Sequence, residues 1–131
     1  MATTTAQVKL TSADISSDSL SIDVTATLTD SGVSTGITDC TGIGVKKLVA
    51  SATTYTIHDA ADFEDNKAAK VFIYNKSTNP VEYVTVDLGT VKMGDLYAGD
   101  WAFFPYAGLV DVTVQGSANN IIIEHAVLGN L

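Results

Sequence analysis

The chain alternates apolar and polar residues over nine positions in the stretch Leu20-Ser21-Ile22-Asp23-Val24-Thr25-Ala26-Thr27-Leu28. Side chains of a β-strand point alternately to opposite faces, so this period places every second residue on one face. A helix would instead repeat about every 3.6 residues. We therefore expect a half-buried strand over 20–28. Its apolar face comprises Leu20, Ile22, Val24, Ala26 and Leu28.

Shorter runs of the same character lie on both sides of this stretch, rich in the β-branched residues that strands favour. They predict further strands at 6–10, 45–57 with an irregularity near Ala50, 70–74, 81–88, 101–104, 109–115 and 120–128. Turn-forming residues separate these runs, for example Asp30-Ser31-Gly32 and Gly116-Ser117-Ala118-Asn119. The pattern predicts an all-β fold, an antiparallel β-sandwich or jelly roll of about eight strands.

One segment, 59–70, has helical character, and Asp59 is placed to cap a short turn there. Its apolar residues are too few for a buried helix, so we expect helix in less than about one-tenth of the chain. No internal repeat and no linker rich in proline or glycine divides the sequence. We therefore expect a single domain over 1–131, with residues 1–5 as a flexible N-terminal arm.

The charge is one-sided: fifteen acidic residues stand against seven basic ones among 131 residues, a formal net charge of −8. All seven basic residues are lysines, so the chain lacks the planar guanidinium that reads phosphates and base edges. An acidic protein is also repelled by a polyanion. We therefore expect no nucleic-acid partner and, for the same reason, no anionic membrane as a partner. The sequence also shows no export signal and no apolar run of about 18 residues, the length that a membrane span requires.

Residues suited to catalysis or to transition-metal binding are scarce. The chain has two histidines, His58 and His125, and one cysteine, Cys40, in a turn-like segment. Nucleophilic catalysis needs a histidine within reach of the nucleophile, and zinc sites need about three or four protein ligands. The single cysteine also excludes an internal disulfide. The sequence thus predicts a non-enzymatic protein with no cofactor and no metal.

Two further groups of polar residues have structural interpretations. His125 shares a strand face with Ile121 and Ile123, which indicates a core or interface histidine whose nitrogens are hydrogen-bonded. The densest acidic cluster suits either a solvated loop or hard-oxygen coordination of calcium, and its spacing is not that of an EF-hand. This cluster comprises Asp59, Asp62, Glu64 and Asp65.

The richest segment is Leu96-Tyr97-Ala98-Gly99-Asp100-Trp101-Ala102-Phe103-Phe104-Pro105-Tyr106, which holds five of the ten aromatic residues. It suits the end of the core, a contact surface, or a platform for stacking on sugar. The strand at 120–128 adds apolar side chains on both faces, one of which needs cover from another layer or subunit. The candidate interaction residues are Tyr97, Trp101, Phe103, Phe104, Tyr106, Ile122 and Leu128.

Three stretches together resemble small virion structural proteins of tailed bacteriophages. They are Lys70-Val71-Phe72-Ile73-Tyr74-Asn75-Lys76-Ser77, then Glu82-Tyr83-Val84-Thr85-Val86, then the Ala-Gly-Asp-Trp turn at 98–101. The resemblance covers about residues 44–131 and implies a role in a virion rather than any chemistry. It implies a capsid cement or decoration protein that is made in the host cytoplasm and binds the exterior of the major capsid protein shell.

Two expectations about function remain open at this point. The first is the cement protein, which we expect to form a homo-oligomer, and a three-fold position on a capsid favours a trimer. The alternative is a carbohydrate- or receptor-binding module of a phage tail or head fibre, with the aromatic segment as its platform.

Overall fold

The structure is a computed structural model that describes residues 4–15, 17–29, 37, 39–66 and 69–129. It is all-β, with 62% strand and 3% helix, which confirms the predicted fold class. The described residues form eleven strands in three antiparallel sheets. Two compact units divide the chain, Met1–Thr38 and Asp39–Leu131, and each is described here by itself. The single domain over 1–131 stays a prediction.

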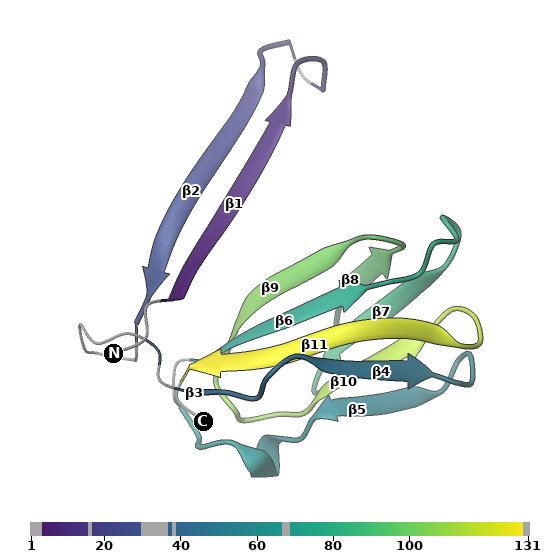
Figure 1. Cartoon of the computed structure of the whole chain (residues 1–131). Helices are drawn as coiled ribbons and strands as arrows, with labels where there is room; N and C mark the ends of the chain where they lie inside the picture. Colours follow the sequence, from purple (N-terminus) through teal and green to yellow (C-terminus); the bar gives the residue numbers. More distant parts are fainter. Residues whose placement is uncertain (1–3, 16, 30–36, 38, 67–68, 130–131) are drawn as a thin grey trace. The chain divides into compact units, whose positions relative to one another are not determined.

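The first unit contains a β-hairpin of β1 (Thr4–Ser12) and β2 (Leu20–Leu28), which pair with each other and with no other strand of the described residues (Figure 1). Their register runs without a break from Thr4 opposite Leu28 to Ser12 opposite Leu20. The strand at 20–28 is thus confirmed, and its expected half-burial stays a prediction. Of the predicted flexible arm, residues 1–3 lie outside the described residues, and Thr4 and Thr5 begin β1.

The second unit contains two antiparallel sheets, seen as two layers of ribbon in Figure 1. One sheet has the strand order β5 (Thr54–His58), β10 (Val112–Gly116), β7 (Tyr83–Leu88), β8 (Val91–Tyr97). In the other, β3 (Asp39–Cys40) and β4 (Gly44–Leu48) both pair with β11 (Ile121–Gly129), followed by β6 (Ala69–Asn75) and β9 (Trp101–Tyr106).

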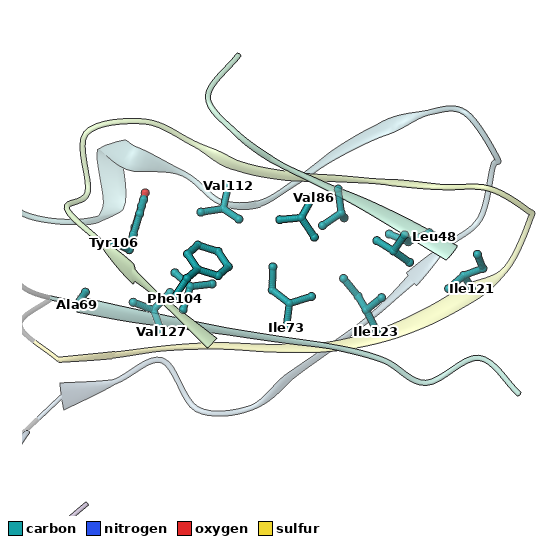
Figure 2. Close-up of a cluster of buried hydrophobic side chains, with 13 residues drawn as sticks. Leu48, Ala69, Ile73, Val86, Phe104, Tyr106, Val112, Ile121, Ile123 and Val127 are labelled. Atoms are coloured by element: carbon teal, nitrogen blue, oxygen red, sulfur yellow. The ribbon is translucent and has the colours of Figure 1, made fainter. Parts of the chain in front are cut away.

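One apolar core lies between these two sheets, as in a β-sandwich (Figure 2). Alternation decides its members: in β6 the burial pattern switches at every residue, so Val71 and Ile73 are fully buried while their neighbours are not. Val86 and Val112 enter the same cluster from the opposite sheet. The aligned layers explain why strands distant in sequence share one core.

The strand count is eleven rather than about eight. The predicted strand 45–57 is two strands, β4 and β5, joined by a turn in which Ala52 has a positive φ of 56°. The strands β3 and β8 lie outside every predicted run.

At 59–70 a 3₁₀ turn, η1 (Ala60–Asp62), replaces the helical segment, and the Asp59 carboxylate accepts a hydrogen bond from Ala61 N as predicted for a cap. Among the described residues, no helix has the length and hydropathy needed to cross a membrane.

Candidate functional site

The outer face of the five-stranded sheet gathers aromatic side chains from two neighbouring strands. Tyr74 of β6 lies opposite Trp101 of β9, and Phe72 lies opposite Phe103. Residues opposite each other in an antiparallel pair project from the same face, so four aromatic residues form two adjacent rows. On the other side of β6, Glu124 of β11 lies opposite Tyr74 and Ala126 lies opposite Phe72. Ile122 and Leu128 project from the same face two residues before Glu124 and two residues after Ala126. The aromatic face is defined here as Phe72, Tyr74, Trp101, Phe103, Ile122 and Leu128.

This face is open to solvent at its ends. Trp101 is 48% exposed and Ile122 is 41% exposed, while the residues between them are partly buried. The chain therefore does not place Trp101 in its own core, which is one of the roles that the aromatic segment suits, and its role in a contact surface stays a prediction. The same face carries charged side chains: Lys76 Nζ lies 2.9 Å from the Glu124 carboxylate. A partly exposed ion pair of this kind contributes little to stability. Lys47 lies opposite Ile122, and Lys70 lies opposite Leu128.

A tight turn between β8 and β9 sets the position of Trp101. Gly99 has a φ of +83°, a left-handed conformation that glycine adopts without strain. Asp100 N donates to Tyr97 O at 2.8 Å, and Tyr97 N donates to the Asp100 carboxylate at 2.9 Å. These bonds close the Ala-Gly-Asp-Trp turn on itself.

Asn75, at the end of β6, fixes this turn to the rest of the sandwich. Its side chain is fully buried, and its amide Nδ2 donates to Leu96 O at 2.9 Å. Its backbone N donates to Asp100 O at 3.0 Å, and its carbonyl accepts from Gly99 N at 2.9 Å. Asn75 thus ties the turn itself and strand β8 to the end of β6. Its role was missed by the sequence analysis, which took Asn75 only as part of a resemblance.

The other candidate interaction residues point elsewhere. Phe104 and Tyr106 alternate with the outward residues of β9 and lie in the core, 8% and 4% exposed. The Tyr106 hydroxyl donates to Val110 O at 2.7 Å, so its polar end is satisfied. Tyr97 lies on β8 beside Tyr83, with ring centroids 5.2 Å apart. Conversely, Phe72 and Tyr74 belong to the aromatic face, a fact that only the strand register reveals.

The structure also brings the two histidines together, although they are far apart in sequence. His58 ends β5 and His125 lies in β11, and their ring centroids are 4.9 Å apart in an edge-to-face arrangement. Both line a surface hollow of about 380 Å³. The predicted hydrogen bonding of His125 is incomplete, because among the described residues neither its Nδ1 nor the Nε2 of His58 has a partner.

Burial keeps both rings neutral near pH 7. Burial, with a smaller contribution from His125, lowers the pKa of His58 from 6.5 to about 4. Burial also lowers the pKa of His125, and the positive charge of Lys46 acts in the same direction. Asp62 lies at the same hollow. Within the described part of the chain, however, no three His, Cys, Asp or Glu side chains gather closely enough to hold a metal ion.

Cys40 does not join this pair. It is exposed on β3, where its Sγ accepts a hydrogen bond from Gly42 N, and it is not among the residues that line the histidine hollow. A thiol needs an adjacent base to act as a nucleophile at neutral pH. The hollow thus joins two neutral imidazoles with the Thr41 hydroxyl and the Asp62 carboxylate, but not with the Cys40 thiol. We take the aromatic face, with its larger apolar area, as the candidate site.

Comparisons of the chain with protein-family models, with curated proteins and with solved structures find no match. Interpretation of the aromatic face therefore depends on its own geometry.

Proposed function

We propose that this chain is a non-enzymatic structural protein of a bacteriophage virion, a cement or decoration protein on the exterior of the capsid. Its partner is the major capsid protein, to which it adds after synthesis in the host cytoplasm. The jelly-roll connectivity and the trimeric state predicted from the sequence belong to the same proposal. The observation that carries it is the aromatic face, with Trp101 half exposed at its edge.

Physical chemistry supports a docking role for this face. Tryptophan and tyrosine supply large apolar area at low entropic cost and are enriched among the residues that dominate interface energies. Trp101, Tyr74 and Phe103 present such area on a rigid sheet rather than on a loop. The net charge of −8 suits the outside of a capsid better than contact with packaged DNA.

The direct test measures binding of the purified protein to capsids that lack it. We expect Trp101→Ala to weaken binding at least about tenfold, a loss of about 1.4 kcal/mol. The matched control is Val91→Ala, which truncates a 64% exposed side chain on β8 of the other sheet and should bind like the wild type. Equal binding of Trp101→Ala and wild type would contradict docking through the aromatic face.

The exposure of Trp101 and Tyr97 also favours the alternative function, a carbohydrate- or receptor-binding module. Exposed aromatic rings present apolar faces that can stack on sugar, and Tyr97 and Trp101 flank one tight turn. A glycan array separates the two functions. Glycan binding that Trp101→Ala abolishes, together with no binding to capsids, would replace the cement function by this one.

A further inference from the structure

The two histidines of the sequence meet where the two sheets of the sandwich face each other. His58 ends β5 of the four-stranded sheet, and His125 lies in β11 of the five-stranded sheet (Figure 1). The chain contains no other histidine, and both rings line the same hollow. The fold therefore collects every imidazole of the chain in one place, with one ring from each sheet.

Each of these rings has a buried nitrogen for which the protein supplies no partner. His58 is only 5% exposed. Its Nε2 and the Nδ1 of His125 are both buried, and neither has a hydrogen-bond partner among the described residues. A buried polar atom without a partner opposes folding, so such atoms are rare in native proteins. Two of them on adjacent rings indicate one shared ligand that satisfies both.

Packing holds the two rings in place. The ring of His125 lies against the backbone of Gly44, where a Cβ would stand 2.7 Å from its Cε1. The ring of His58 packs edge-to-face against Phe63, with centroids 6.1 Å apart. A site whose groups are already held in position loses little conformational entropy when it binds a ligand. The pair is therefore suited to hold a small ligand firmly.

The distance between the rings is the one that two imidazole ligands of a single metal ion adopt. Two imidazoles that bind one ion tetrahedrally, at about 2.0–2.1 Å from each nitrogen, have ring centroids roughly 5 Å apart. The centroids of His58 and His125 are 4.9 Å apart. Rotation about the bond between metal and nitrogen leaves the angle between the ring planes free, so the observed 73° is compatible with this arrangement.

The other groups around the rings favour a transition-metal ion. Imidazole suits zinc, nickel and copper, whereas calcium and magnesium prefer oxygen ligands. The Asp62 carboxylate at the same hollow adds negative charge, although the positive charge of Lys46 acts on His125 in the opposite sense. Because no third His, Cys, Asp or Glu side chain of the described residues is close enough to join the site, water would complete the coordination.

We propose that His58 and His125 together bind a divalent transition-metal ion of the zinc and nickel type, which links the two sheets of the sandwich. The prediction of no metal was based on the scarcity of ligands in the sequence, which does not show that the two histidines meet. The proposed site lies within the sandwich, so it is independent of what the aromatic face binds.

Equilibrium dialysis of the full chain against Zn²⁺, after treatment with a chelator, measures the binding. We expect about one zinc ion per chain at micromolar zinc and neutral pH, with no displacement by an excess of Ca²⁺. His58→Gln and His125→Gln should each weaken binding at least about tenfold, while unchanged fluorescence of Trp101 shows that the sandwich is folded. The matched control is Cys40→Ser, which removes the one thiol of the chain and should bind zinc like the wild type.

Nitrogen NMR of the imidazole rings provides a test that needs no variant. Titration with Zn²⁺ should shift the resonances of His58 Nε2 and His125 Nδ1 together, and zinc should raise the melting temperature of the wild type. Absence of zinc binding would overturn the proposal and leave the hollow to water alone. Zinc binding that both histidine variants retain, that Cys40→Ser abolishes, or that leaves the imidazole resonances unchanged would also overturn it, because the ligands would then lie elsewhere.

Discussion

His58 is the residue whose protonation most directly affects the stability of the sandwich. Its folded-state pKa of about 4 lies below the ordinary value of 6.5, so folding favours the neutral ring. The stability is complete above pH 6.5 and falls as the pH decreases toward 4, because only the unfolded state gains the proton. The loss is on the order of 3 kcal/mol for this shift. The lowered pKa of His125 changes stability in the same direction.

Urea denaturation at a series of pH values checks this prediction. Because carboxylates also titrate near pH 4, the informative quantity is the difference between the wild type and His58→Gln, which cannot gain the proton. That difference should change between pH 6.5 and 4 and be constant above pH 7. A wild type and a variant with parallel pH profiles would show that His58 does not resist protonation in the folded state.

The ring of His125 leaves no room for a side chain at position 44, so this position needs glycine. The two residues lie opposite each other on β4 and β11, and a Cβ at position 44 would stand 2.7 Å from His125 Cε1. We therefore expect Gly44→Ala to destabilise the protein by about 1–3 kcal/mol through overpacking. In a His125→Ala background the same change should cost little, because the ring is gone. Equal costs in the two backgrounds, measured by a double-mutant cycle, would contradict this contact.

At the scale of the element, neighbouring residues of strand β9 have two different roles. Phe104 points into the core, so Phe104→Ala should cost about 3–5 kcal/mol. Trp101 is half exposed, so Trp101→Ala should cost about 2 kcal/mol or less in the free protein. Urea denaturation of both variants tests this difference. A cost for Trp101→Ala as large as that for Phe104→Ala would mean that Trp101 is buried in solution, for instance within an oligomer.

Several strands could be predicted because their alternation is unambiguous. The stretch 20–28 appears as β2 with its predicted bounds. The predicted strands 70–74 and 120–128 differ from β6 and β11 by one residue at each end. The strand β8 was missed because Lys92-Met93-Gly94-Asp95 lacks alternation, and its pairing with β7 shifts register near Gly94. Such a strand forms because its partner supplies hydrogen bonds, which single-sequence patterns do not show.

The candidate site was only partly predictable for a related reason. The aromatic segment itself marks β9, but its neighbours Phe72 and Tyr74 come from a strand about thirty residues earlier, and only the register joins them. The same holds for His58 and His125. Alternation also shows that one face of β2 is apolar without showing what covers it. The alternation of the sequence shows on which face of a strand a residue lies. Which strands pair, and which sheets contact each other, is determined only in the folded chain.

At the scale of the whole molecule, the distribution of charge distinguishes the surfaces. The hairpin strands are neutral together, whereas the tip that joins them contains Asp14 and Asp18. The net charge of −8 makes every copy of the protein strongly acidic. Copies of the protein therefore associate against long-range electrostatic repulsion. Whether docking onto a capsid is opposed or assisted depends on the charge of the capsid surface.

Salt should therefore strengthen the homo-oligomer. Raising the ionic strength from about 10 mM to about 150 mM shortens the Debye length from about 30 Å to about 8 Å, which screens repulsion between copies but leaves apolar packing in place. Sedimentation at the two ionic strengths should show tighter association at the higher one. Asp14→Asn, which keeps an acceptor for Ser12, should reduce this salt dependence because it removes a charge from each tip. Association that weakens with salt would mean instead that pairs of opposite charge hold the copies together.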